Sequence, residues 1–309
     1  MQEVIDRYGR RLTGLRISVT QNCNLECFHC HREGQKEASE EMMPEEIGAI
    51  ARIGASLGVK KIKITGGEPL IRKDICEIIS EMRPYVREIS LTTNGILLGN
   101  LSDGLKKSGL DRINVSLHSL SGDCLSRITG KDYLPEVKEG LRAAKKANLS
   151  PIKINMVVLK DINDFEIPEM IKFASEMGAT LELIELATDR SGCNEEYFKK
   201  HHFSLEDIES QLSATAHLIT HNELHRRAQY EITENGSRVI VELVRSMHNT
   251  IFCANCTRVR VTSDGRLKGC LFEDGNSIDI LGAIRAGVSD DMLRDMFISC
   301  VSNRKPYWS

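Results

Sequence analysis

Strand-like and helix-like segments alternate six times within the first 186 residues, and this alternation constrains the fold more than any other feature. The expected strands are short and rich in β-branched residues, and they cover residues 15–20, 60–65, 88–93, 112–117, 152–159 and 181–186. Six β-then-α units predict a parallel sheet with helices outside it. Such a sheet is either open and doubly wound or curled towards a barrel, and ligands bind at the carboxyl ends of its strands in both cases.

The pattern changes after about residue 190, where β-rich segments dominate. Asn235-Gly236 and Asp264-Gly265 each separate two such segments and predict hairpin turns. We therefore expect a core of residues 1–190 and a smaller β-containing region of residues 191–309. A chain of 309 residues is long enough for one large α/β domain with an addition of this size.

Composition and charge restrict the function classes. The formal net charge of −3 argues against a general polyanion binder, so we expect no nucleic-acid partner. The N-terminal residues lack the apolar run of a signal peptide, and no segment has the roughly 18 apolar residues that span a membrane. We expect a cytoplasmic protein without membrane contact. Clustered cysteines in such a protein indicate metal binding or catalysis, because disulfides are rare in a reducing compartment.

Three of the ten cysteines lie within eight residues, directly after the first expected strand, as Cys23-x-x-x-Cys27-x-x-Cys30. Three thiolates can hold three irons of a cubane iron–sulfur cluster and leave the fourth iron open for chemistry. The alternative is a structural zinc site completed by His29 or His31. Zinc sites usually pair two close ligands with two distant ones, so the spacing favours the cluster.

A second group consists of Cys253-x-x-Cys256 and, after thirteen further residues, Cys270. By spacing alone it is typical of a zinc ribbon that lacks one ligand, which His248 could supply, and equally of an iron–sulfur site. Both groups are expected to bind metal.

The first cysteine group, followed by Gly66-Gly67-Glu68-Pro69 after the second strand and by the motifs at residues 92–95 and 115–119, resembles the radical S-adenosylmethionine superfamily. The resemblance implies a partial (β/α)6 barrel of the TIM type. It also implies a [4Fe–4S] cluster on Cys23, Cys27 and Cys30 that cleaves S-adenosylmethionine to a 5′-deoxyadenosyl radical. The residues that would contact S-adenosylmethionine are His29, Gly67 and Ser116.

The segment MHNTIFCANCTRVRVTSDGRLKGCLF resembles the C-terminal signature of the GTP 3′,8-cyclase family of molybdenum-cofactor biosynthesis. The resemblance implies a second [4Fe–4S] cluster on Cys253, Cys256 and Cys270, whose open iron meets the guanine base. The residues that would bind GTP by this likeness are Arg16, Lys63, Thr92, Lys153, Arg258, Val259 and Arg260. Five of these are cationic, which suits a triphosphate with about four negative charges at neutral pH.

The same resemblance implies a reaction and its partners. The radical would remove the ribose 3′ hydrogen of GTP, and the carbon radical would attack C8 of guanine to give 3′,8-cyclo-7,8-dihydro-GTP. The implied partners are an electron donor such as ferredoxin or flavodoxin and the next pathway enzyme, cyclic pyranopterin monophosphate synthase. The oligomeric state stays open, with a homodimer as one option.

This sequence departs from the family in two places. Relatives commonly end in Gly-Gly, whereas this chain ends in SNRKPYWS, and relatives often carry methionine where Ala187 stands here. These departures concern the catalytic detail more than the substrate class. Two other function classes stay open. One is a radical enzyme with an auxiliary cluster that acts on a peptide or another nucleotide, and the other is a non-catalytic zinc or redox-sensing module. A shared substrate requires both cysteine groups to face one positively charged chamber.

Overall fold

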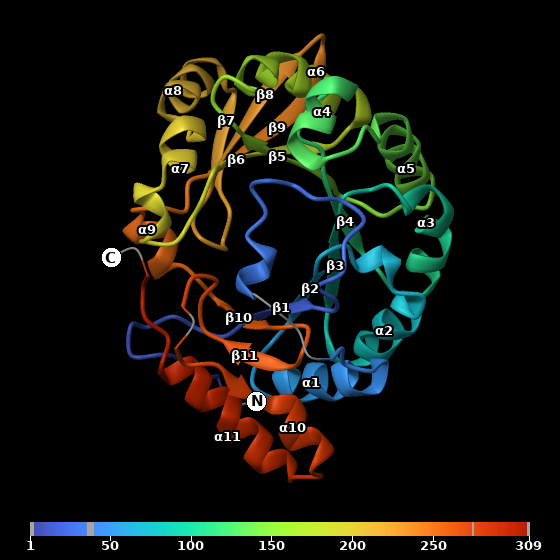
Figure 1. Ribbon diagram of the computed structural model, residues 1–309, viewed down its shortest axis with the longest axis vertical. Coiled ribbons are helices and arrows are strands. Elements are labelled where there is room, and N and C mark those ends of the chain that lie inside the picture. Colours follow the sequence, from blue (N-terminus) through green and yellow to red (C-terminus); the bar gives the residue numbers. More distant parts are fainter. Residues whose placement is uncertain (1–2, 36–39, 274, 308–309) are drawn as a thin grey trace.

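The computed structural model describes residues 3–35, 40–273 and 275–307, and its centre is an open ring of parallel strands (Figure 1). In the order of the chain, the ring strands pair in parallel with one another. They are β1 (Gly14–Ser18), β2 (Lys61–Thr65), β3 (Glu88–Thr93), β4 (Arg112–Ser116), β5 (Ile152–Val158) and β6 (Thr180–Glu185). The six predicted strands are confirmed, and the ring is the partial barrel expected from them.

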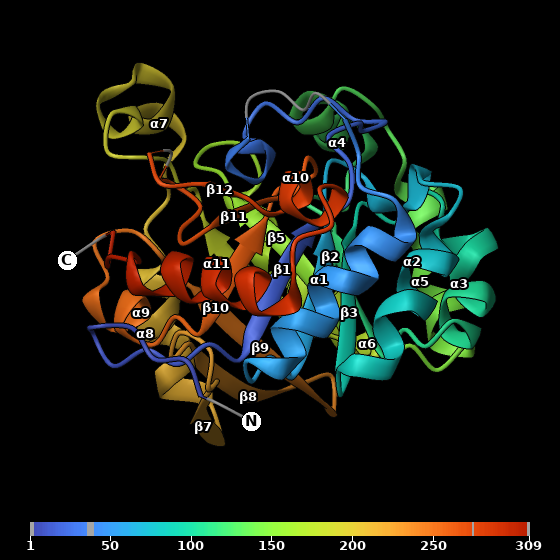
Figure 2. The ribbon, with the colours of Figure 1, turned by 90° about the horizontal axis from the view of Figure 1, so that it is seen from below.

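The helices that follow the strands lie outside the ring, except for α4, which lies at one end of it beside the loop after β1 (Figures 1 and 2). They are α1 (Pro44–Ser56), α2 (Ile75–Met82), α3 (Leu98–Lys107), α4 (Gly122–Thr129), α5 (Leu134–Lys146) and α6 (Ile167–Met177). Pro44 occupies the first turn of α1, as expected. The sequence pattern did not predict α4, which has only eight residues and is fixed by local contacts. The side chain of Ser121 accepts a hydrogen bond from the backbone of Cys124 and so caps its first turn.

The remaining strands extend the same sheet at both of its edges. They are β7 (Leu218–His221), β8 (Ala228–Glu234), β9 (Ser237–Val244), β10 (Arg258–Val261), β11 (Arg266–Lys268) and β12 (Ile278–Asp279). The strand order is β12-β11-β10-β1-β2-β3-β4-β5-β6-β9-β8-β7, with β10 parallel to β1 and β9 parallel to β6. The C-terminal strands are thus continuous with the core sheet, and the boundary near residue 190 stays a prediction.

Both predicted hairpins are present. The β8–β9 pair turns at Asn235 and Gly236, whose φ angles of 50° and 76° are those that a tight two-residue hairpin turn requires. The β10–β11 pair turns at Asp264-Gly265. Because these hairpins join opposite edges of the ring, the segment between β9 and β10, which carries Cys253 and Cys256, crosses from one edge to the other.

The last helices flank the ring. They are α7 (Glu196–His201), α8 (Glu206–Thr215), α9 (Thr250–Ala254), α10 (Ile280–Arg285) and α11 (Asp290–Ser302). Of these, α10 and α11 pack beside α1 (Figure 2). Ion pairs from Arg52 to Asp290 and from Arg285 to Glu46 join this helical layer. No helix in the described ranges is both long and apolar enough to cross a membrane.

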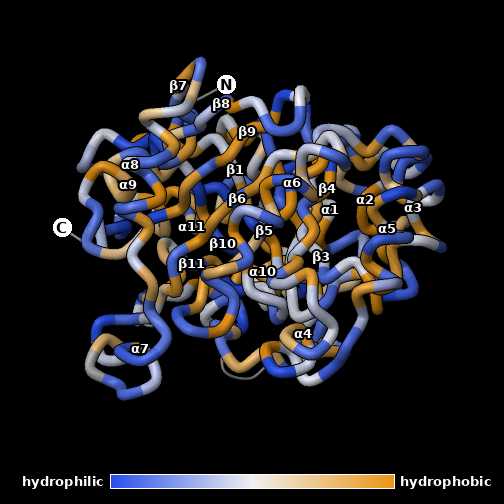
Figure 3. The backbone as a smooth tube through the Cα atoms, turned by 90° about the horizontal axis from the view of Figure 1, so that it is seen from above, coloured by the Kyte–Doolittle hydropathy of each residue, from blue (hydrophilic) through white to orange (hydrophobic). Residues whose placement is uncertain are grey.

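Side chains alternate along the ring strands, so that one face packs on the helices and the other faces the ring interior. Ile17, Ile64 and Leu91 belong to the buried apolar core, and hydrophobic residues concentrate along the strands (Figure 3). The alternate positions carry polar residues such as Arg16 and Lys63. The interior of the ring is therefore polar and suited to a charged ligand.

Candidate active site

One cavity inside the ring receives both cysteine groups. Cys23, Cys27 and Cys30, here called the first triad, lie in the loop after β1. The second triad comprises Cys253 in α9, Cys256 after it, and Cys270 after β11. All six side chains line the same cavity, which is the arrangement that a shared substrate requires. None of the six forms a disulfide in the described structure.

Burial and mutual repulsion disfavour the thiolate forms of the first triad. Burial raises the pKa of the Cys27 thiol to about 12, and the charges of Cys30 and Cys23 add to this effect. Burial also raises the pKa of Cys23, with Glu68 and Cys30 contributing. Ionised thiolates at this spacing repel one another, and a cationic iron cluster removes the repulsion. The residues present therefore fit the implied cluster.

The second triad has similar electrostatics. Burial raises the pKa of Cys270, and Cys256 and Cys253 raise it further, whereas Arg260 opposes them. Within residues 3–35, 40–273 and 275–307, no three His, Cys, Asp or Glu side chains are grouped so as to hold a single metal ion. A cubane does not need such convergence, because each thiolate binds a separate iron.

The three residues expected to contact S-adenosylmethionine also line this cavity, namely His29, Gly67 and Ser116. Burial, followed by the charge of His118, lowers the pKa of His29 well below its usual value, so its ring is neutral. Its Nδ1 atom is buried without a hydrogen-bond partner in the described structure and can accept one from a ligand. A Cβ at Gly67 would lie 2.1 Å from the carbonyl oxygen of Asn22, so only glycine fits where this turn meets the cysteine loop.

The predicted substrate residues divide into two sets. Arg16, Lys63, Thr92, Arg258 and Arg260 line the cavity. The hydroxyl of Thr92 is buried without a hydrogen-bond partner among the described residues and can bind a ligand.

Lys153 and Val259 are not among the residues that line this cavity. The Nζ atom of Lys153 lies 2.9 Å from Glu182 Oε1 and 2.6 Å from Glu242 Oε2. Val259 packs in the apolar core, because alternation along β10 turns its neighbours Arg258 and Arg260 towards the ring interior. These positions describe the side chains in the absence of GTP. The GTP contacts expected for Lys153 and Val259 stay predictions.

The cavity cations also differ in their partners. Arg16 and Arg260 form ion pairs with Glu33. Lys63 and Arg258 form no ion pair with a carboxylate among the described residues, although the charge of Glu182 favours the protonated form of Lys63. Burial lowers the pKa of Lys63 well below its usual value, and burial followed by the charges of Arg260 and Arg16 lowers the pKa of Arg258 to about 9. A buried cation without a counter-ion is costly, and an anionic ligand would relieve that cost.

Several cavity residues could not be predicted from the sequence. The ring of His225 stacks on Phe252 with centroids 3.7 Å apart, and its Nδ1 atom lies 3.4 Å from a guanidinium nitrogen of Arg258. Arg227 pairs with Glu182 and Glu242. His225 and Arg227 lie in the connection between β7 and β8, and no motif spacing in the sequence marks them. Glu33 could have been suspected only because it follows Cys30 by three residues.

Comparison of the sequence with known proteins identifies the family of this chain. Residues 17–174 match the profile of the Radical SAM superfamily, and residues 179–309 match that of Molybdenum Cofactor Synthesis C. A curated relative from Pyrococcus abyssi (strain GE5 / Orsay), named probable GTP 3′,8-cyclase, is 50% identical over 306 residues, covering 99% of this chain and 100% of the relative. The chain belongs to the GTP 3′,8-cyclase family.

Other comparisons agree with membership of the GTP 3′,8-cyclase family. A relative from Methanothermobacter marburgensis (strain ATCC BAA-927 / DSM 2133 / JCM 14651 / NBRC 100331 / OCM 82 / Marburg), also named probable GTP 3′,8-cyclase, is 44% identical over 99% of both chains. The crystal structure of Streptococcus suis SuiB bound to S-adenosylmethionine superposes with a TM-score of 0.69 at 16% identity, covering 96% of this chain and 67% of SuiB. The likeness to SuiB shows a radical S-adenosylmethionine fold and no more.

Proposed function

We propose that the protein converts GTP to 3′,8-cyclo-7,8-dihydro-GTP in molybdenum-cofactor biosynthesis. The observation that carries this proposal is the cavity that both cysteine triads share with Lys63 and Arg258, two cations that form no ion pair among the described residues. Full-length relatives of the same family give the reaction its identity.

The first triad would hold the [4Fe–4S] cluster that binds S-adenosylmethionine. When both are bound, the cluster and S-adenosylmethionine would supply a one-electron cleavage of the sulfonium bond, which yields a carbon radical able to abstract hydrogen. Gly67 lets the backbone approach the cofactor, and the neutral His29 and Ser116 contribute contacts around it. These residues orient the cofactor, and the enclosing strands keep water from the reacting atoms.

The second triad would hold the auxiliary [4Fe–4S] cluster beside the guanine base. Lys63 and Arg258 would bind the triphosphate without first leaving an ion pair, whereas Arg16 and Arg260 are paired with Glu33. Thr92 offers a hydroxyl to the nucleotide. Binding energy at the triphosphate then fixes the ribose 3′ carbon relative to the cofactor, which is how a distant contact accelerates a reaction.

We further propose that a protein such as ferredoxin or flavodoxin donates the electrons and that cyclic pyranopterin monophosphate synthase consumes the product. The reaction is proposed to take place in the cytoplasm. Trp308 and Ser309 at the chain's C-terminus lie outside the described residues, whereas Lys305 and Tyr307 line the cavity where family members place a Gly-Gly tail.

Anaerobic reconstitution with iron and sulfide tests the proposal directly. We expect about eight irons per chain, as two cubanes require. Incubation with GTP, S-adenosylmethionine and a reductant should yield both 5′-deoxyadenosine and a cyclised nucleotide, detected by mass spectrometry. Formation of 5′-deoxyadenosine without a cyclised nucleotide would favour another substrate, and absence of both products would refute the proposed reaction.

A further inference from the structure

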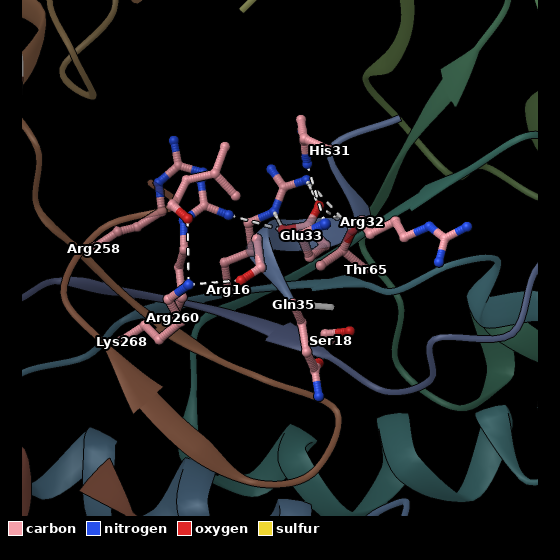
Figure 4. Close-up of polar contacts among 12 residues, drawn as sticks. Arg16, Ser18, His31, Arg32, Glu33, Gln35, Thr65, Arg258, Arg260 and Lys268 are labelled. Atoms are coloured by element: carbon pink, nitrogen blue, oxygen red, sulfur yellow. Dashed lines mark hydrogen bonds and ion pairs between the residues drawn. The ribbon is translucent and has the colours of Figure 1, made fainter. Parts of the chain in front are cut away.

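Glu33 lies between two of the arginines that are expected to bind GTP (Figure 4). The Nε and Nη2 atoms of Arg16 lie 2.9 and 2.5 Å from its two carboxylate oxygens. An Nη1 atom of Arg260 lies 2.8 Å from one of the same oxygens, and the hydroxyl of Thr65 donates to the other at 3.0 Å. A carboxylate that is bidentate to one guanidinium and shared with a second occupies the geometry in which arginines bind phosphate.

The backbone around Glu33 is strained and is held by contacts from distant parts of the chain. Arg32 and Glu33 have φ angles of 46° and 54°, which non-glycine residues seldom adopt. The ring of His31 accepts a hydrogen bond from the Glu33 amide at 3.1 Å, and Lys268 donates to the Gly34 carbonyl at 2.7 Å. The ion pairs of Glu33 help to hold this conformation, so their loss would release the loop that follows the first triad.

The electrostatics of the site make Glu33 and a triphosphate competitors. Burial alone would raise the pKa of Glu33, but the guanidinium groups of Arg16 and Arg260 hold it well below its usual value. Glu33 is therefore ionised in the nucleotide-free protein, where it offsets the repulsion among Arg16, Arg258 and Arg260. A triphosphate brought to the same arginines would face this carboxylate, and like charges in one buried site are strongly unfavourable.

We propose that Glu33 occupies the place of a substrate phosphate in the nucleotide-free protein, and that the triphosphate of GTP takes Arg16 and Arg260 from it on binding. This inference rests on the proposed function and adds a residue that tunes nucleotide affinity. It also links the nucleotide site to the loop after the first triad, since Glu33 belongs to that loop.

Binding measurements on the reconstituted full-length protein test the inference. Glu33→Gln keeps the size of the side chain but removes the competing charge, so the dissociation constants for GTP and for inorganic triphosphate should each fall roughly tenfold. Glu46→Gln is the matched control, because Glu46 is a buried partner of Arg285 outside the cavity. It should leave both constants unchanged. If Glu33 only held Arg16 and Arg260 in position for the ligand, E33Q would weaken the binding of GTP and of inorganic triphosphate.

A second measurement uses the wild-type chain and does not depend on the folding of a variant. Inorganic triphosphate should speed hydrogen exchange at the backbone amides of residues 33–35, because displaced Glu33 no longer holds the strained loop. Slower or unchanged exchange, or E33Q affinities equal to or weaker than those of the wild type, would overturn the inference while leaving the proposed function intact. If the wild-type protein showed no measurable GTP binding and formed no cyclised product, the proposed function itself would be refuted.

Discussion

Two buried clusters of charged side chains in the ring differ in the ratio of carboxylates to cations. The Glu33 cluster combines one carboxylate with Arg16, Arg260 and the neighbouring Arg258. The Glu182 cluster pairs two carboxylates, Glu182 and Glu242, with two cations, Lys153 and Arg227. The first has excess positive charge and can accept an anion, whereas the second is internally neutral. The difference teaches that a group of buried cations indicates an anion site when its positive charges outnumber the carboxylates that pair with them.

The largest expected effect is on stability and comes from unbalancing the neutral cluster. Glu242→Gln leaves Lys153 and Arg227 buried with one carboxylate between them, and breaking such a network typically costs about 3–5 kcal/mol. Urea unfolding of the reduced, metal-free chain measures this loss. Glu231→Gln removes the partially exposed partner of Arg238 on the same hairpin and should cost less than about 1 kcal/mol. Equal losses of unfolding free energy in Glu242→Gln and Glu231→Gln would contradict the view that the Glu182 cluster is a buried, balanced network.

The next effect is on nucleotide affinity. Arg258→Ala should weaken GTP binding by about 10- to 100-fold, because a hydrogen bond to a charged group contributes roughly 1.5–3 kcal/mol. Lys153→Met should lower stability but change GTP affinity by less than about threefold, since its charge is already balanced. Titration calorimetry on the reconstituted variants measures both constants. A Lys153→Met variant as weak as Arg258→Ala would support the GTP contact that family resemblance assigns to Lys153.

The smallest expected effect is a difference in acid stability. Despite burial, nearby cations hold the pKa of Glu33 and of Glu182 well below the unfolded value of 4.5. Each carboxylate therefore stabilises the fold above about pH 4.5, and this contribution is lost as the pH falls below that value. Urea unfolding at several pH values should show a shallower acid decline for E33Q and for E182Q. Saturating inorganic triphosphate should remove the Glu33 contribution alone, and a loss of both would contradict the separation of the clusters.

The parts of the fold that follow local patterns were predictable. The strands follow from β-branched alternation, the hairpin at Asn235-Gly236 follows from turn chemistry, and the first triad follows from the spacing of Cys23, Cys27 and Cys30. The edges of the sheet were not predictable in this way. No local sequence pattern predicts that β10 pairs with β1, because that pairing depends on contacts between residues far apart in the chain.

The same limit applies to the site. Glu33 meets Arg260 across 227 positions of sequence, and Lys153 meets Glu242 across 89. Spacing and composition identify cationic side chains but not their carboxylate partners. The sequence therefore predicted five cations for the triphosphate, whereas in the folded chain only Lys63 and Arg258 among these five form no ion pair with a described residue.

The parallel pairing of β10 with β1 has a consequence for biosynthesis. β1 leaves the ribosome early, but the strand that covers its free edge is among the last to be translated. Until then the nascent barrel keeps an open seam next to the loop that carries Cys23, Cys27 and Cys30. The edge of β1 beside the first cysteine loop is therefore covered only when the C-terminal hairpin docks.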